Sequence, residues 1–379
     1  MNRAVGESLD LPAVETPVAV VDLARVRANA HRVVQYARGH GLRWRPHVKT
    51  HKSLGIARIQ LEAGATGLTV ATLHEAEVMS AVSRDLLLAY PPVGRRKLDR
   101  LVRLPDEVRL SVALDSPEVL YPLAGAVREA GRSVRVLVEL DVGLGRVGVP
   151  DPQDAARLAA EVTELDGVEF EGLLFYAGHI RSPGPEQDRD MATLGQTLER
   201  VYAALDRRGL RPRVVSGGTT PTLWRSHEVP GLTEIRPGTC IYNDRDAVAQ
   251  GAATPDDWAY SVLTTVVSTR VPGRAAVDAG SKALAKEARG GSGFGVVLGR
   301  PEVTVAALSE EHGVLDLSGT DWRPRVGDRI RIVPNHVCVS VNLQERILVT
   351  EGTQIEAWPL EGRGRLHIAV DPTTRDGAG

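Results

Sequence analysis

One short stretch of the sequence, residues 43–53, concentrates the side chains that could do chemistry. Arg-Trp-Arg-Pro-His-Val-Lys-Thr-His-Lys-Ser holds two histidines and two lysines, Lys49 and Lys52, where a strand-like run ends and a helix-start signal, Ser53, follows. At the C-terminal end of a strand in a β/α protein, such groups meet at the mouth of an active site. A lysine desolvated there becomes a nucleophilic amine, as Schiff-base chemistry requires. The alternative is a solvated basic loop, and this stretch alone leaves both interpretations open.

The elements around this stretch read as alternating strands and helices. After a strand at 18–22 and a helix through His40, β-rich runs alternate with amphipathic helical segments such as 116–131 and 187–209. This alternation predicts parallel βαβ units, and eight strands close a β/α barrel. We expect the strand at 18–22, a ninth, to pair outside the barrel. The eight predicted barrel strands lie near 43–48, 67–71, 85–89, 108–114, 134–140, 168–176, 213–216 and 233–236.

The pattern changes near residue 251. From Tyr260 onward, runs rich in Val, Thr and Ile are broken by Gly and Pro, without a convincing long helix. This pattern predicts a mostly antiparallel β-domain. We therefore expect two domains, 16–250 and 251–379, with the strand at 18–22 free to pair with the second. Runs that we expect to be strands of the β-domain include 262–271, 303–308, 329–333 and 346–349.

Composition and charge exclude several functional classes. The 379 residues carry a formal net charge of −2, and no basic field points to nucleic acid. The two cysteines, Cys240 and Cys338, cannot form a disulfide framework, and free thiols fit a reducing cytoplasm. We find no apolar run long enough for a signal peptide or a membrane span. We therefore expect a cytoplasmic protein that binds neither nucleic acid nor membranes.

Polar clusters follow most of the predicted barrel strands, so they should converge at one end of the barrel. Lys49 ends the first strand, Arg146 follows the fifth, and Tyr176 and His179 end the sixth. The loops after the seventh and eighth strands, where barrels often bind phosphate, are rich in Gly and hydroxyl groups. A phosphate site facing a lysine predicts pyridoxal phosphate as cofactor. Each loop alone could be an ordinary turn, and the prediction depends on their agreement. These two loops read Ser216-Gly217-Gly218-Thr219-Thr220 and Arg236-Pro237-Gly238-Thr239.

The run from Gly143 to Gly148 also matches the Gly-x-Gly-x-x-Gly fingerprint of dinucleotide binding. That fingerprint needs a helix that opens within the glycines. Here Pro150 and Pro152 follow at once, so a helix can begin only near Pro152 or Gln153. The sequence therefore disfavours a dinucleotide site.

A second chemical cluster lies in the predicted β-domain, in Pro-Asn-His-Val-Cys at 334–338. In an extended segment, side chains two apart lie on one face, so we expect His336 and Cys338 to point the same way. An imidazole beside a thiolate forms half of a zinc site, and two protein ligands leave positions for water and substrate. The alternative is a buried cysteine beside a hydrogen-bonded histidine.

Together these motifs resemble the D-threonine aldolase/D-serine dehydratase family, the fold-type III pyridoxal-phosphate enzymes that are built like alanine racemase. The resemblance runs from about Thr16 to about Pro359. It implies a (β/α)8 barrel followed by a β-domain, a homodimer, and a divalent metal beside the cofactor. The motifs that carry it are Pro-His-Val-Lys-Thr-His-Lys, Leu-Gly-Arg-Val-Gly, Ser-Gly-Gly-Thr-Thr, Arg-Pro-Gly-Thr, Ser-Glu-Glu-His-Gly and Pro-Asn-His-Val-Cys.

The resemblance also implies roles for single residues. Lys49 is similar in position to the Schiff-base lysine, Arg146 to the arginine at the cofactor ring, and Tyr176 to a cofactor or substrate contact. His336 and Cys338 match the metal pair. With the loop residues, the expected cofactor-binding set is Lys49, Arg146, Tyr176, Ser216, Gly217, Gly218, Thr219, Gly238 and Thr239.

The second metal ligand divides the family. Aldolase members usually carry His-x-Asp and dehydratase members His-x-Cys, as here. Because sulfur is the softer ligand, Cys338 favours zinc over manganese or magnesium. The interpretation that follows is a lyase in which Lys49 removes the α-proton of a D-amino acid and the β-hydroxyl departs, as in conversion of D-serine to pyruvate and ammonia. The alternative is retro-aldol cleavage to glycine and an aldehyde, with His179 or a metal-bound water as base.

Two further readings have less support. An alanine racemase needs a second base, usually a tyrosine, and the predicted β-domain holds a single tyrosine, Tyr260, near its start. A non-catalytic pyridoxal-phosphate carrier ends after the barrel, whereas this chain continues through a whole β-domain.

Overall fold

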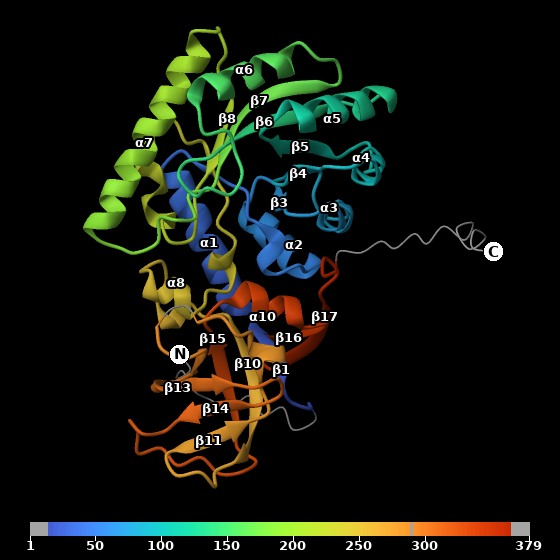
Figure 1. Cartoon of the computed structure of the whole chain (residues 1–379). Coiled ribbons are helices and arrows are strands. Elements are labelled where there is room, and N and C mark those ends of the chain that lie inside the picture. The colour runs from blue at the N-terminus through green and yellow to red at the C-terminus, as the bar shows by residue number, and fades with distance from the viewer. Residues whose placement is uncertain (1–13, 289–290, 365–379) are drawn as a thin grey trace, which may run out of the picture.

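Eight parallel strands form the first of two sheets in the computed structural model, which describes residues 14–288 and 291–364 (Figure 1). Their order around the sheet is β2-β9-β8-β7-β6-β5-β4-β3. Two backbone hydrogen bonds join its ends, from Thr66 N to Trp44 O (2.9 Å) and from Thr69 N to Pro46 O (2.8 Å), so the sheet closes as a barrel. The predicted barrel strands are thus confirmed as β2 (Arg43–Trp44), β3 (Leu68–Val70), β4 (Asp85–Leu88), β5 (Arg109–Leu114), β6 (Val134–Leu140), β7 (Val168–Phe175), β8 (Val214–Gly217) and β9 (Glu234–Ile235).

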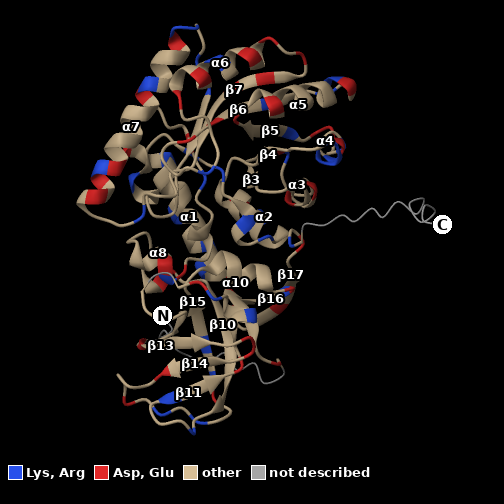
Figure 2. Cartoon of the chain, in the orientation of Figure 1, with Lys and Arg blue, Asp and Glu red and all other residues tan. Residues whose placement is uncertain are grey.

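Helices cover the outside of the barrel, with charged residues on their outer faces (Figure 2). Helix α6 begins at Pro152 and is capped by the Asp151 carboxylate, so no helix opens within the glycines 143–148. The dinucleotide reading is therefore excluded, as the prolines predicted. The helices between and after the barrel strands are α1 (Leu23–Gly39), α2 (Leu54–Ala63), α3 (Leu73–Met79), α4 (Arg95–Leu101), α5 (Pro117–Glu129), α6 (Pro152–Thr163), α7 (Pro185–Asp206) and α8 (Arg245–Ala249), with short 3-10 turns η1 (Val48–Thr50), η2 (Leu223–Glu228), η3 (Thr239–Ile241) and η4 (Pro255–Asp257).

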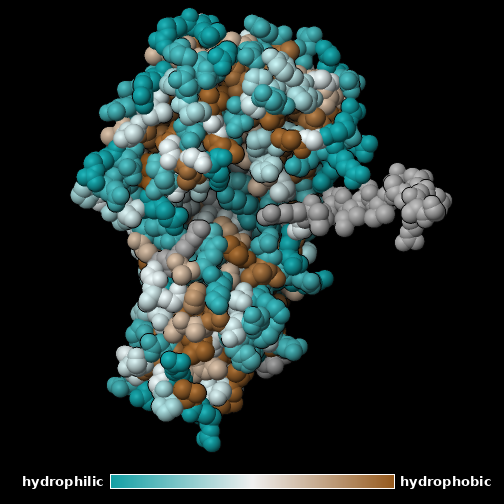
Figure 3. Space-filling view, in the orientation of Figure 1, coloured by the Kyte–Doolittle hydropathy of each residue, from teal (hydrophilic) through white to brown (hydrophobic). Residues whose placement is uncertain are grey.

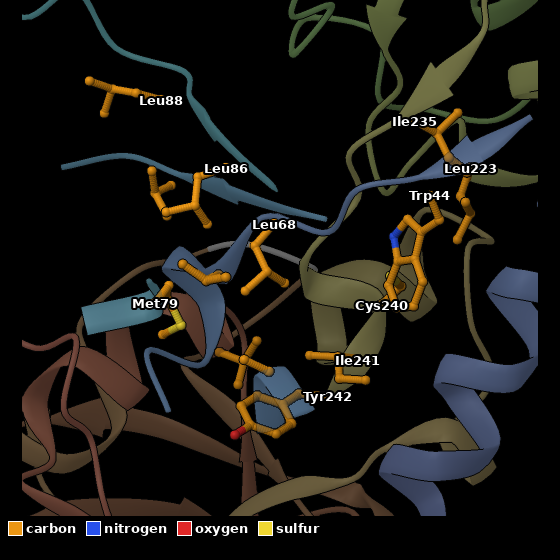
Figure 4. Close-up of a cluster of buried hydrophobic side chains, with 14 of the residues drawn as sticks. Trp44, Leu68, Met79, Leu86, Leu88, Leu223, Ile235, Cys240, Ile241 and Tyr242 are labelled. Atoms are coloured by element: carbon orange, nitrogen blue, oxygen red, sulfur yellow. The ribbon is translucent and has the colours of Figure 1, made fainter. Parts of the chain in front are cut away.

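The barrel interior is filled in layers, which leaves only its C-terminal end open to a ligand. A small apolar layer lies in the middle. Toward the N-terminal ends of the strands, the buried Arg45 bridges Asp85 (2.7 Å) and Glu234 (2.8 Å), so these charges are paired rather than left free. The larger core lies between strands and helices and includes Trp44, Leu68 and Tyr242 (Figure 4). The residues of the apolar layer are Leu87, Ala113, Leu137, Leu174 and Val214.

The second sheet has nine strands, all antiparallel to their neighbours except in the β1–β16 pair. Strand β1 (Val18–Asp22) lies between β10 and β16 and so pairs outside the barrel. We propose that the boundary between the barrel and the β-domain lies near residue 250, shortly before β10. The other strands are β10 (Tyr260–Ser268), β11 (Arg274–Val277), β12 (Gly295–Val297), β13 (Arg300–Leu308), β14 (Gly313–Asp316), β15 (Arg329–Pro334), β16 (Arg346–Glu351) and β17 (Gln354–Pro359).

One local prediction is wrong. The segment after His336 is not extended but forms helix α10 (Val337–Leu343), while α9 (Ser281–Leu284) is a single short turn. Valine-rich sequence favours a strand, but here the run Val-Cys-Val-Ser-Val packs as a short helix against η1 and α9. Helix α10 is thereby the part of the β-domain that reaches the mouth of the barrel (Figure 1).

The surface mixes hydrophobic and hydrophilic residues over both parts of the molecule (Figure 3). Of the helices in the described ranges, none combines the length and apolar character needed to cross a bilayer.

Candidate active site

Lys49 stands at the C-terminal end of the first barrel strand, in the 3-10 turn η1. Its Nζ lies 5.6 Å from the centroid of the Tyr176 ring. The guanidinium of Arg146 lies 4.9 Å from the same centroid. The structure therefore brings together three residues that come from different strand ends and that the sequence predicted to meet.

The neighbouring lysine, Lys52, is held in an ion pair. Its Nζ forms an ion pair of 2.7 Å with Glu75, whose side chain is fully buried, and the other carboxylate oxygen of Glu75 accepts a hydrogen bond from Ala71 N. Lys52 also holds a positive φ of 53°, an uncommon conformation for a non-glycine residue. Because its ammonium group is already neutralised by a buried partner, Lys52 is the structural lysine, and Lys49 is the one available for chemistry.

An inner cavity of about 360 Å³ opens above the apolar layer of the barrel, with Lys49 on its wall. Residues of the predicted phosphate loops also line it, among them Gly218, Thr219, Gly238 and Thr239. Gly238 is required there, because a Cβ atom at this position would lie 2.4 Å from the carbonyl oxygen of His47. Within the described residues, the backbone N–H groups of Gly218, Thr219, Thr220, Gly238 and Thr239 donate no hydrogen bond to the protein.

Two predicted cofactor residues lie below this cavity rather than in it. The Ser216 hydroxyl donates to Glu234 (2.7 Å) and accepts from Arg236 (2.9 Å). A Cβ on Gly217 would meet the Phe175 ring at 2.2 Å, so this glycine permits packing of β8 on β7. Both residues support the loop above them, and neither lines the cavity.

His47, Glu139 and Arg236, which were not among the predicted site residues, also line the inner cavity. Burial raises the pKa of Glu139 to about 7, although the positive charges of Arg236 and Arg146 oppose the shift, and its Oε2 has no hydrogen-bond partner. Burial, assisted by the charge of Lys49, holds the pKa of His47 well below its usual value, so this imidazole is neutral. A carboxylate near the C-terminal end of a largely apolar strand was the sequence signal for Glu139.

An outer cavity of about 500 Å³ continues from the inner one toward the β-domain. The two share Lys49, Tyr176, Thr219 and Thr239 on their walls. The rest of its described lining comes from both domains, and His336, Cys338, Val339 and Asn342 are the part from the β-domain, so a small molecule there would touch both. Its further lining includes Lys52, Glu75, Arg181, Asp244, Asp246, His336 and Cys338.

His336 and Cys338 do meet, although not by the predicted geometry. His336 is extended and caps α10, and Cys338 lies in its first turn, which brings imidazole and thiol within hydrogen-bonding reach. Burial opposes charge on both groups, yet their mutual attraction raises the pKa of His336 to about 9 and lowers that of Cys338. A thiolate beside an imidazole is the ionisation state from which a metal displaces one proton.

The surroundings of this pair orient both side chains. Glu287 Oε2 lies 2.6 Å from His336 Nδ1, which leaves Nε2 as the ring nitrogen available to a metal. The Thr50 hydroxyl lies 3.2 Å from Cys338 Sγ. Asp244 accepts from Val337 N (2.9 Å) and so fixes the start of α10. Among the residues described, three or more His, Cys, Asp or Glu side chains nowhere gather so as to hold a metal ion, so a metal here would have two protein ligands.

Two other candidate bases lie outside the cavities. The predicted base His179 is exposed, with Nε2 against Gly143, and lines neither cavity. Tyr260, the tyrosine that a racemase reading would need, is buried with its hydroxyl 2.8 Å from Ser340 Oγ.

Comparison with known proteins agrees with this geometry. Residues 21–246 match the family model "Alanine racemase, N-terminal domain", and residues 259–350 match "Putative serine dehydratase domain". The chain is 32% identical to a D-threonine aldolase of Arthrobacter sp., over 93% of this chain and 94% of that protein. It is 34% identical to a D-threo-3-hydroxyaspartate dehydratase of Delftia sp. (strain HT23), over 87% and 92%.

A solved D-threonine aldolase from Filomicrobium marinum superposes with a TM-score of 0.87 at 33% identity, over 93% of this chain and 97% of that one. The Delftia dehydratase has also been solved, in one case as a cysteine-to-alanine variant in a metal-free form.

Proposed function

The chain belongs to the D-threonine aldolase/D-serine dehydratase family, and on this premise we propose that it is a pyridoxal-phosphate- and metal-dependent lyase of D-β-hydroxy amino acids. The observation that carries the proposal is the position of Lys49 at the junction of two cavities. One cavity offers free N–H groups for a phosphate, and the other offers an imidazole–thiol pair for a metal.

The residues of the inner cavity fit pyridoxal phosphate. The free N–H groups of Gly218, Thr219, Gly238 and Thr239 would bind its phosphate, and Lys49 would bond to its aldehyde carbon. Arg146 and Tyr176 would flank its ring. When bound, this cofactor supplies an electron sink for the charge that develops on the α-carbon of an amino acid.

Lys49 is the group of this chain that takes the α-proton. In contrast to Lys52, the side-chain nitrogen of Lys49 has no carboxylate partner within the described residues. When this nitrogen is an uncharged amine, it can therefore accept a proton from the substrate. Neutral His47 adds no positive charge beside it. The buried Lys52–Glu75 pair closes the wall next to Lys49 and keeps the local charge balanced.

His336 and Cys338 fit a divalent metal, with Glu287 orienting the imidazole. A thiolate ligand favours zinc. When bound, the metal supplies Lewis acidity to the β-oxygen of the substrate. The His-x-Cys pair that dehydratase members of the family share supports β-elimination as the leading reaction, with D-serine giving pyruvate and ammonia.

Retro-aldol cleavage is the second candidate, since the relatives described above include D-threonine aldolases. In that case the β-hydroxyl must lose its proton, and because His179 lies outside both cavities, a metal-bound water is the better candidate base.

Product analysis separates the two reactions. With D-threonine, elimination gives 2-oxobutyrate and ammonia, whereas retro-aldol cleavage gives glycine and acetaldehyde. We expect the former, and a predominance of glycine with acetaldehyde would establish the aldolase reaction instead. We also predict that the protein is a homodimer and that it is located in the cytoplasm.

A further inference from the structure

The lysine and arginine side chains of the outer cavity, which could bind an acidic substrate, already have other partners. Its described lining includes three lysine or arginine residues. Lys49 is reserved for the cofactor, and Lys52 is neutralised by Glu75 at 2.7 Å. The third, Arg181, is neutralised by Asp246, with NH2 and Oδ2 2.5 Å apart.

The Arg181–Asp246 pair is held from both sides of the cavity. Arg181 comes from the segment after β7 that also carries Tyr176, and Asp246 lies in the first turn of α8. The backbone N–H of Asp246 donates to the carbonyl oxygen of Asn335 (3.1 Å), the residue before His336. The carboxylate is thereby tied to the segment that carries the imidazole–thiol pair.

The exposure of the two side chains decides what a substrate meets. Arg181 is 39% exposed and Asp246 is 14% exposed, and both line the cavity, so a substrate would meet the guanidinium together with the carboxylate that compensates its charge. Two more carboxyl groups, Glu75 and Asp244, lie on the same walls. Among the described lining residues, a second carboxylate on a substrate would meet no lysine or arginine that is neither paired with a carboxylate nor reserved for the cofactor. Burying a charge without a partner is costly.

We infer that the Arg181–Asp246 pair selects substrates with an uncharged β-substituent, of the D-serine and D-threonine type, against D-3-hydroxyaspartate, whose β-carbon carries a carboxylate. This inference rests on the proposed lyase function. Rejection of the wrong substrate by a like charge is a common basis of specificity. The family alone leaves the question open, because the relatives include enzymes named for both substrate classes.

The test compares kcat/KM for D-serine or D-threonine with that for D-threo-3-hydroxyaspartate. The wild-type enzyme should prefer the monocarboxylic substrates. Asp246→Asn, which removes the competing charge and frees Arg181, should shift this ratio toward hydroxyaspartate by roughly tenfold or more, mainly through KM. Adding Arg181→Gln to Asp246→Asn should cancel the shift. If the pair only braces the fold, each variant lowers both activities together and the ratio stays constant.

A binding measurement provides a second readout. D-Aspartate, which lacks the hydroxyl, should bind the holoenzyme more tightly in Asp246→Asn than in wild type, while D-alanine binding should not change; the visible spectrum of the cofactor reports both. An unchanged ratio with retained D-serine or D-threonine turnover, or a wild-type preference for hydroxyaspartate, overturns the inference and leaves the proposed function standing. Absence of turnover with every D-β-hydroxy amino acid overturns both.

Discussion

The two neighbouring lysines should respond oppositely to removal. Lys49→Ala should abolish the visible absorbance band of the lysine-bound cofactor and turnover, because the neighbouring described lysine, Lys52, is paired with Glu75. The stability of the cofactor-free protein should change little, since the Lys49 ammonium forms no ion pair among the described residues and its cation–π contact at 5.6 Å contributes about 0.5–1 kcal/mol. Lys52→Met should instead keep the absorbance band and lower the stability of the cofactor-free protein.

The expected loss for Lys52→Met follows from burial. The Lys52 and Glu75 side chains are 7% and 0% exposed, and the variant leaves the carboxylate without its cation. Breaking a buried pair in this way costs about 3–5 kcal/mol. Urea unfolding of both variants without cofactor measures the stability, and visible spectroscopy of the reconstituted proteins measures the bond. Retention of the band in Lys49→Ala together with its loss in a stable Lys52→Met would refute the assignment.

Four further predictions concern the metal pair, the phosphate loop and a buried imidazole. Glu287→Gln should weaken metal binding by about 10–100-fold, because it loosens the orientation of His336, and titration with zinc measures this. Cys338→Asp should move the metal preference from zinc toward manganese, as reactivation of chelator-treated enzyme will show; an unchanged order would contradict the ligand assignment. Gly238→Ala should lower cofactor occupancy, because its Cβ would meet a carbonyl oxygen at 2.4 Å, which equilibrium dialysis measures. His51 accepts a hydrogen bond from a backbone N–H, and burial lowers its pKa to about 3. It therefore stabilises the fold above the unfolded-state pKa of about 6.5 and does so progressively less as the pH falls toward 3. Between pH 7.5 and 5.5 the free energy of unfolding of wild type should fall by about 1.4 kcal/mol more than that of His51→Gln, and equal losses would argue against a neutral His51.

The barrel and the position of Lys49 at a strand end could be predicted from sequence because both depend on local patterns. Apolar strands alternating with amphipathic helices fix the parallel sheet, and parallel strand ends place Lys49, Arg146 and Tyr176 together. The choice between Lys49 and Lys52 could not be made in this way. It depends on Glu75, more than twenty residues away, which is buried beside Lys52 only through the tertiary structure.

The errors have the same origin. The polar segment that carries His179 follows a strand, but the chain turns after Gly178 and leaves this imidazole on the outside. The loop motif at Ser216 was predicted as a single binding unit, whereas its first two residues still belong to β8 and line neither cavity. His336 and Cys338 meet because a helix cap precedes a helix, not because a strand continues. Each of these side-chain directions depends on where an element ends, which periodicity does not define to one residue.

The central claim is that the chain is a lyase of D-β-hydroxy amino acids. The most direct test incubates the cofactor- and zinc-loaded enzyme separately with D-serine, D-threonine and their L-enantiomers, and follows substrate loss together with all keto acids, ammonia, glycine and aldehyde formed. The structure and the family predict carbon–oxygen bond cleavage of the D-enantiomers, with pyruvate from D-serine, and no reaction of the L-enantiomers. Equal turnover of both enantiomers, or racemisation without bond cleavage, would contradict the claim.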